Sequence, residues 1–464
     1  MIRPRSSVTL SFGAVLLLPL LVVSSCSPEA PTSPAGPIGE AAAASTGPTV
    51  TSADPTSAPQ STTLDVRVLG TGYDRGSRAV WALNGDTTFA TTKVRTNSTR
   101  YVSSKQLVAN ITIAADAPLD LYDIVAVTSS GKKGIGIERF TVTLQITDIG
   151  TLPNAWPSFP KQVSAAGIAV GGGYTGPNYS GALHALRWNL SGGTVTLEDL
   201  TPRLGNSIES NALGLNEAGD IVGYFRTAAG DPHAFLLTAT GMVDLHSLCN
   251  GVEDGKDASG AYDVNAHGEV VGFRGITTDG MGSSYRAFYR VDGCTVELPT
   301  LGGPSQGNAI NDNGVIVGSS GGYAVRWTKN PNTAGGWDMV TLGAGTARAI
   351  NRAGDAVGDG GKLWPASGGE ILLGTFGGEI AGYTTMATGI DDDGTVVGWS
   401  LTKSTVQRGF RWTASTGMVD LGSYSNNNNS AAYAISGGVI VGIADVGQTL
   451  RTGRETHATM WTGR

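Results

Sequence analysis

The 464-residue sequence has few charged residues, few cysteines and no clustered excess of basic residues. Asp, Glu, Lys and Arg together make up 15% of it, the formal net charge is −7, and only three cysteines occur. Nucleic-acid-binding proteins normally carry a basic stripe on one face, so nucleic acid is excluded as an expected partner. No segment after the first 25 residues approaches the roughly 20 apolar residues of a membrane-spanning helix.

Glycine and small apolar residues are plentiful instead. The chain has 68 glycines and a hydrophobic content of 40%. This glycine content is about twice the ordinary usage, which favours short strands joined by tight turns. The length indicates several folding units or one large repetitive fold.

The N-terminus has the three regions of a secretory signal. Arg3 and Arg5 precede an almost wholly apolar stretch from 8 to 23, which ends on Ser24-Ser25-Cys26. Basic, apolar and small residues in this order are typical of export signals. The ending resembles the lipobox of bacterial lipoproteins, although a plain secretory signal cut elsewhere remains an alternative.

The lipobox resemblance implies a signal peptide over 1–25 and an acylated Cys26 as the mature N-terminus. Stable membrane anchoring requires more than one acyl chain, and lipoproteins of this kind carry two or three on the cysteine. Ser27 follows Cys26, and the absence of Asp there indicates the outer membrane or cell surface. Residues 26–60 are rich in Ser, Pro, Ala and Thr, which predicts a disordered tether.

Residues 61–145 predict a small β-sandwich. Apolar and polar residues alternate between turn signals, as in Leu64-Asp65-Val66-Arg67-Val68, and about seven short strands fit an immunoglobulin-like fold. The runs 69–77 and 103–108, with Tyr122-Asp123-Ile124, resemble the IPT/TIG group of immunoglobulin-like domains. That group implies a spacer or interaction module, with Trp81 in its core.

Seven copies of one pattern fill residues 146–464. The phrase Asn-x-x-Gly-x-x-Val-Gly closes at Gly171, Gly223, Gly272, Gly318, Gly358, Gly398 and Gly442. Each copy continues with an aromatic or aliphatic phrase, and most add a third, so each predicts about four strands. Asn-x-x-Gly suits a tight turn, and the closing glycine allows a close approach between strands.

A four-stranded unit cannot bury both of its faces alone, whereas a closed ring of such units can. We therefore expect a seven-bladed β-propeller. The last unit lacks its third phrase and residues 146–152 supply one, so this N-terminal strand is expected to complete the seventh blade. An open β-solenoid is the alternative, because repeats do not fix curvature.

The phrase His233-Ala234-Phe235 marks the repeats as similar to the HAF family of extracellular repeats. The likeness spans about 146–464 and implies an exported protein, but no particular activity. The sequence departs from the pattern at Ser164 and Ser436, which replace Asn, and at Gly361-Lys362, which replaces His-Ala.

Candidate site residues are few, and no catalytic residue is expected. Cys249 and Cys294 form a candidate disulfide, with two buried thiols as the alternative. Glu253, Asp254 and Asp257 are candidate ligands of a structural calcium ion, and no other metal or cofactor is expected.

Aromatic and histidine residues recur at fixed places in the repeats. Five tryptophans are expected in the core between blades: Trp188, Trp327, Trp364, Trp412 and Trp461. His184, His233 and His457 share one position and are expected to bond a neighbouring strand. Trp156, Trp337 and Trp399 stand outside the tryptophan column and are the candidate ligand surface.

The sequence as a whole predicts a non-enzymatic, lipid-anchored envelope protein whose propeller binds a protein or glycan partner. The first alternative is an extracytoplasmic propeller enzyme, a glycosidase or lyase, with Asp and Glu from different blades converging at the central mouth. The second is a purely structural envelope component. Architecture alone does not decide between them.

Acylation of Cys26 can be tested by metabolic labelling with a fatty-acid analogue. The wild-type chain is expected to take up label and Cys26→Ser to take up none, because the thiol is the acceptor. Label that persists in Cys26→Ser would contradict the assignment.

Overall fold

The computed structural model describes residues 47–86, 93–205, 207–246, 258–275, 285–333, 335–378, 384–424, 428–449 and 453–463. Within these ranges the regular elements are strands and two single-turn 3-10 helices, η1 (Ser191–Gly193) and η2 (Thr201–Arg203). The prediction of an all-β chain is confirmed. None of the described elements is a helix of the length and apolarity that a membrane crossing requires. The signal peptide and Cys26 lie outside the described residues.

The first part of the described chain is a sandwich of two four-stranded sheets, with strand orders β1-β3-β6-β5 and β2-β8-β7-β4. Its strands are β1 (Thr49–Asp54), β2 (Ser57–Pro59), β3 (Thr63–Thr71), β4 (Arg78–Leu83), β5 (Val94–Ser103), β6 (Gln106–Ile113), β7 (Leu121–Val127) and β8 (Lys133–Thr143). Side chains from both sheets share one core. Trp81 is buried there, edge-on to Phe140 with ring centroids 5.9 Å apart.

The predicted end of the tether at residue 60 is wrong. Strand β1 pairs antiparallel with β3 and β2 pairs parallel with β8, so both belong to the sandwich. Val50 and Ala53 are buried in its core. The segment is poor in large apolar residues, but its backbone gains partners at two sheet edges, which composition does not reveal.

Seven further four-stranded sheets follow. The first three contain β10 (Ser158–Val163), β11 (Ile168–Tyr174), β12 (Leu183–Asn189) and β13 (Thr196–Asp199); β14 (Ser210–Leu215), β15 (Ile221–Arg226), β16 (Pro232–Thr238) and β17 (Gly241–Asp244); β18 (Ala258–Val264), β19 (Val270–Gly275), β20 (Arg286–Val291) and β21 (Cys294–Glu297). The next three contain β22 (Ser305–Ile310), β23 (Ile316–Ser320), β24 (Tyr323–Lys329) and β25 (Trp337–Ala344); β26 (Ala347–Ile350), β27 (Ala356–Gly358), β28 (Lys362–Trp364) and β29 (Ile371–Leu372); β30 (Thr385–Ile390), β31 (Val396–Leu401), β32 (Gln407–Thr413) and β33 (Gly417–Asp420). The last contains β34 (Ser430–Ser436), β35 (Val439–Thr449), β36 (Gly453–Thr462) and β9 (Gln145–Gly150).

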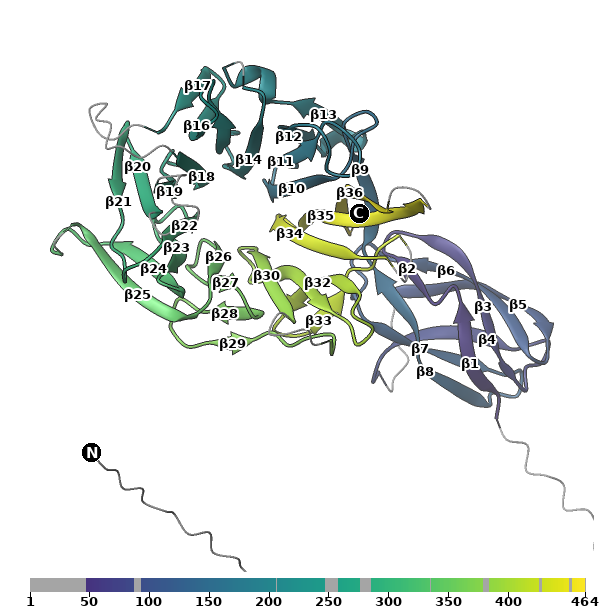
Figure 1. Ribbon diagram of the computed structural model, residues 1–464. Helices are drawn as coiled ribbons and strands as arrows, with labels where there is room; N and C mark the ends of the chain where they lie inside the picture. The colour runs from purple at the N-terminus through teal and green to yellow at the C-terminus, as the bar shows by residue number, and fades with distance from the viewer. Residues whose placement is uncertain are drawn as a thin grey trace, which may run out of the picture. The chain divides into compact units, whose positions relative to one another are not determined.

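These sheets succeed one another around a ring, with the first strand of each nearest the centre (Figure 1). Each sheet contacts the next, and β10 of the first sheet contacts β34, β35 and β36 of the last. The tryptophan column fills the space between sheets, as predicted. Trp188, Trp327, Trp364 and Trp461 are at most 1% exposed, and Trp412 is partly buried.

A buried serine joins successive sheets. The Ser210 hydroxyl accepts the Ala185 N–H at 3.0 Å across the first joint, and Ser305 accepts the Ala287 N–H at 2.9 Å across the third. Ser158 of the first sheet accepts the Ala458 N–H of the last at 3.2 Å. The joint between the last and first sheets therefore has the same hydrogen bond as joints within the series.

Strand β9 completes the last sheet by pairing antiparallel with β36. His457 Nδ1 lies 2.7 Å from Asp148 Oδ2, a bond between residues 309 positions apart in the chain. Burial alone would lower the pKa of His457, but the bonds and charges of Asp148 and Glu455 outweigh it and raise that pKa above its usual value. The pKa of Asp148 is lowered, because the His457 and Gly150 hydrogen bonds together outweigh its burial.

His457 and Asp148, which we call the closing pair, are expected to make the stability of the protein depend on pH. A raised histidine pKa contributes stability that is complete below the unfolded value of about 6.5 and is lost as pH rises through the folded pKa. The lowered Asp148 pKa contributes stability that is complete above the unfolded value of about 3.9 and is lost as pH falls through the folded pKa. The difference in melting temperature between wild type and His457→Gln should therefore be greatest at mildly acidic pH and shrink in alkaline buffer.

A double-mutant cycle with Asp148→Asn separates the pair from other effects. We expect the double variant to be about as stable as either single variant. Fully additive losses would show that the two side chains do not stabilise the closure through each other.

Candidate functional site

Each innermost strand of the ring carries one β-bulge at the same place. The register with the second strand jumps by one residue in all seven sheets. The extra residues, which we call the bulge ring, are Lys161, Leu213, Tyr262, Asn308, Arg348, Thr388 and Tyr433. Bulges commonly redirect a side chain, and all seven of these, with Gln306, line one hollow of about 270 Å3.

The closing glycine of each repeat lies opposite its bulge. A Cβ added to Gly318 would stand 2.0 Å from the Gln306 carbonyl oxygen, and one added to Gly223 would stand 1.9 Å from that of Asn211. The other five closing glycines give 2.0 to 2.1 Å. The predicted close approach is confirmed, and its cause is the bulge.

The bulge ring is chemically varied although its backbone position is repeated. Each member stands ten residues before its closing glycine in six copies and nine before it in the seventh. The set comprises two cations, two phenols, an amide, a hydroxyl and one aliphatic side chain, and it has no carboxylate. These residues form no motif in the sequence, and the one signal that marks them is their fixed distance from the closing glycine.

The hollow lined by the bulge ring is one end of a channel through the ring of sheets, and Lys161 and Arg348 give this end a positive charge. The Lys161 ammonium lies 4.8 Å from the Tyr433 ring centroid and 5.3 Å from that of Phe159. Burial, and then the charge of Arg348, lower the Lys161 pKa. Arg348 uses Nε to contact Asp359 Oδ1 at 2.6 Å. Burial is also the largest cause that raises the pKa of Tyr262 and Tyr433 to about 12, so both phenols keep their protons at neutral pH.

The opposite end of the channel is formed by the Asn-x-x-Gly turns. Asn311 Oδ1 accepts the Val315 N–H of its own turn at 3.0 Å, and its Nδ2 donates to the Asn351 carbonyl of the next sheet at 3.0 Å. Asn265 donates to the Asn311 carbonyl in the same way, at 3.1 Å. The asparagine thus shapes its turn and links neighbouring sheets.

Carboxylates from several sheets converge at this turn end, but their oxygens already accept hydrogen bonds, most of them from neighbouring sheets. Backbone N–H groups donate to them as follows: Ala165 to Glu217 at 2.8 Å, Ala266 to Asp312 at 2.9 Å, Arg352 to Asp392 at 2.9 Å and Gly438 to Asp391 at 3.1 Å. Asp263 accepts the Ile310 N–H at 2.9 Å, and burial raises its pKa to about 7. The acids therefore stabilise the contacts between sheets.

The three recurrent histidines bond neighbouring strands, as predicted. His184 lies 2.7 Å from Asp199, His233 lies 2.8 Å from Asp244, and His457 forms the closing pair with Asp148. Each pair joins the third strand of a sheet to its outermost strand, away from the channel. Across the described ranges, no three His, Cys, Asp or Glu side chains are grouped as a metal site would require.

The candidate ligand surface of tryptophans is not assembled. Trp337 is 6% exposed and packs edge-on to Tyr289, with centroids 5.0 Å apart, so its prediction as a ligand-facing residue is wrong. The aromatic contact and the core around it take up its ring. Trp156 and Trp399 are half-buried, and neither belongs to the residues that line the channel.

The cysteine and calcium predictions fall largely on undescribed residues. Cys294, at the start of β21, is disulfide-bonded. Cys249 and the candidate calcium ligands Glu253, Asp254 and Asp257 lie outside the described residues. The pairing of Cys249 with Cys294 and the calcium site stay predictions.

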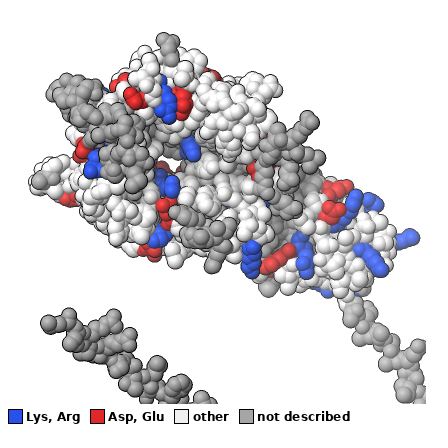
Figure 2. Space-filling view, viewed as in Figure 1, with Lys and Arg blue, Asp and Glu red and all other residues white. Residues whose placement is uncertain are grey.

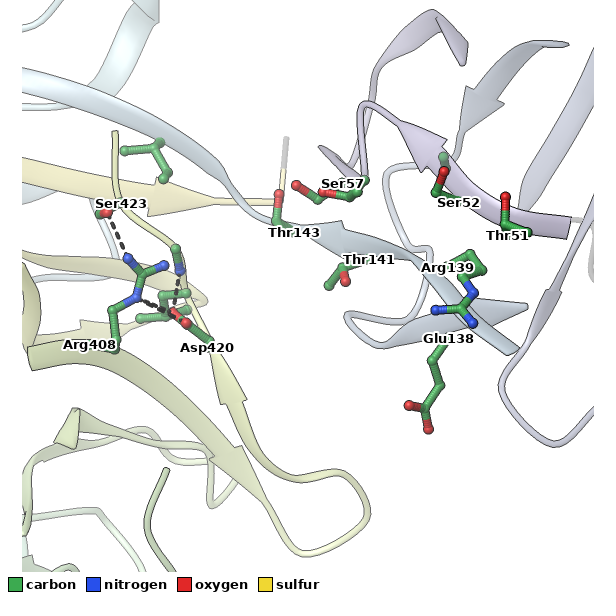
Figure 3. A pocket seen from close by; sticks show the side chains of 15 residues that line it. Thr51, Ser52, Ser57, Glu138, Arg139, Thr141, Thr143, Arg408, Asp420 and Ser423 are labelled. Atoms are coloured by element: carbon green, nitrogen blue, oxygen red, sulfur yellow. Dashed lines mark hydrogen bonds and ion pairs between the residues drawn. The ribbon is translucent and has the colours of Figure 1, made fainter. Parts of the chain in front are cut away.

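A larger hollow of about 450 Å3 is lined by sandwich residues and by β32 and β33 (Figure 3). Three of its charged side chains, Arg408, Asp420 and Glu138, have partners. Arg408 Nε contacts Asp420 at 3.0 Å and its Nη1 donates to Ser423 at 2.9 Å, while Glu138 accepts a bond from Asn84 at 3.0 Å. Two of the seven ring sheets contribute to it: the sixth through β32 and β33, and the last through Ile146 on β9. The channel, which draws at least one residue from every ring sheet, is therefore the candidate site.

Replacing a closing glycine should disrupt the bulge. Gly318→Ala is expected to lower the free energy of unfolding by about 1–3 kcal/mol, because the added methyl overlaps a backbone carbonyl that must shift. Ser319→Ala, at the adjacent position, is the control and should change stability little. Equal melting temperatures for the two variants would contradict the proposed role of the glycine.

Comparisons with known proteins identify no family. No protein-family model and no curated protein matches the sequence. Among solved structures, an auxiliary nutrient binding protein from Bacteroides ovatus is 12% identical, with a TM-score of 0.30, and the match covers 82% of this chain and 87% of that one. A prolyl endopeptidase is 9% identical, with a TM-score of 0.37, and the match covers 76% of this chain and 54% of that one.

Proposed function

We propose that the chain is a non-enzymatic, lipid-anchored protein of the cell envelope that binds a protein or glycan partner through its ring of sheets. Cys26 would supply the acyl anchor at the outer membrane or cell surface. The sandwich would act as an immunoglobulin-like spacer of the IPT/TIG kind, and the ring as a seven-bladed propeller of HAF repeats. Export and acylation rest on the sequence pattern alone.

Two features support a closed propeller over an open solenoid. Strand β9 occupies the edge of the last sheet, so that edge has a partner. The serine bond between Ser158 and Ala458 repeats across the joint from the last sheet to the first. An open array would leave both ends without these contacts.

The bulge ring is the observation that carries the binding function. Seven equivalent backbone positions present varied side chains to one hollow, whereas the closing glycine opposite them is the same in all seven copies. Ligand sites commonly combine aromatic surface with a few placed polar groups. The hollow therefore offers charged, aromatic and amide groups to a ligand.

An enzyme remains the second candidate because of Asp263. Its buried carboxyl has a pKa of about 7 and lines the channel, which suits a general acid or base at neutral pH. Against this role, both of its oxygens already accept backbone N–H groups, from Val264 and Ile310. Release of reducing ends or unsaturated products from a glycan, abolished by Asp263→Asn, would favour the enzyme.

Binding can be tested with the full chain in detergent, screened against arrayed glycans and purified envelope proteins. We expect at least one defined ligand, with binding lost in Leu213→Trp, which fills the channel. Val243→Trp is the matched control, because Val243 lies exposed on the outer strand β17. Absence of any ligand, or equal binding by the two variants, would contradict a channel-binding function.

A further inference from the structure

We propose that the bulge ring binds an acidic sugar, whose carboxylate lies between Lys161 and Arg348. This inference rests on the proposed binding function and narrows it to one ligand class. It draws on the charge of the ring, on its aromatic and polar groups, and on the opposite charge at the other end of the channel.

Lys161 is a crowded cation without a carboxylate partner. Among the described residues it forms no ion pair, and its neighbours are the rings of Phe159 and Tyr433. Several other basic groups of the ring sheets pair with acids, as Lys362 does with Glu370 at 3.2 Å. Lys161 is half-buried, and a partly desolvated cation is costly unless it is paired, so an anionic ligand would supply the partner that the chain does not.

Arg348 presents the second cation. Its ion pair with Asp359 uses Nε, and within the described ranges its two terminal nitrogens have no carboxylate partner. A guanidinium is a planar donor that suits a carboxylate oxygen pair. Arg348 is close enough to Lys161 for its charge to help lower the lysine pKa, so the two cations can act on one anion.

The remaining groups suit a sugar better than a bare anion. Tyr262 and Tyr433 add aromatic surface and two protonated hydroxyls. Asn308 donates through Nδ2 to the Ala347 carbonyl at 2.8 Å, which leaves its Oδ1 as an acceptor beside Gln306. The hollow of about 270 Å3 is slightly smaller than the roughly 300 Å3 at which ligand pockets begin, a size that favours one sugar residue over a longer chain.

The two ends of the channel differ in charge. Lys161 and Arg348 lie at the bulge end, where no carboxylate lines the hollow. At the turn end, one cation, Arg352, is outnumbered by the carboxylates of Glu217, Asp312, Asp391 and Asp392. Figure 2 shows basic side chains around a hollow in the middle of the ring. This difference in charge attracts an anion to the positive bulge end and repels it from the acidic turn end.

Isothermal titration of the full chain with D-galacturonate and D-glucuronate, against galactose and glucose at equal ionic strength, tests the inference. We expect the sugar acids to bind at least about tenfold more tightly than the neutral sugars. Lys161→Met should lose about tenfold in affinity for the acids, and Lys161→Arg should recover much of it. Lys105→Met removes an exposed charge in the sandwich turn between β5 and β6 and should bind as wild type does.

Melting curves of each variant check that Lys161→Met is folded. Equal affinity of wild type and folded Lys161→Met for the acids, or neutral sugars bound as tightly as acids, would overturn the inference. Inorganic phosphate bound as tightly as the sugar acids would overturn the assignment to a sugar. If an arrayed glycan or protein binds wild type and Lys161→Met equally but not Leu213→Trp, the inference fails while the proposed binding function stands.

Discussion

The ring depends on the close approach between the backbone of each bulged strand and the glycine of the strand beside it. Each innermost strand bends one residue out of register, and its carbonyl moves to within about 2 Å of where a side chain would begin on the second strand. Only glycine has no atom there. The repeat therefore fixes a glycine at that point, and the bulge leaves the neighbouring channel position free to vary.

The class of the fold could be predicted from the sequence because its signals are local. Alternation of apolar residues and regularly spaced turns indicated strands, and the tryptophan column indicated a core between repeated units. Trp188, Trp327 and Trp461 are fully buried. Periodicity reports on which side chains face a core, and it does so without any knowledge of distant contacts.

The candidate site could not be predicted in the same way. Lys161, Tyr262 and Arg348 form no motif, since they are more than 80 positions apart and share only a place in the repeat. The misplaced tether boundary has a similar origin, because β1 and β2 depend on backbone pairing with β3 and β8. Trp337 stands outside the tryptophan column, yet a partner on β20 buries its ring. Long-range pairing, and not local composition, decides each of these cases.

The pairing of β9 with β36 has a consequence for the order of folding. Synthesis delivers β9 ahead of every other strand of the seven sheets, but its partner β36 follows much later, since the bonded residues Asp148 and His457 are 309 positions apart. Contacts this distant in sequence slow folding, and an unpaired strand edge is exposed to association with other chains in the meantime. The strands of the sandwich all lie before β9, so the sandwich can form while β9 still lacks its partner β36.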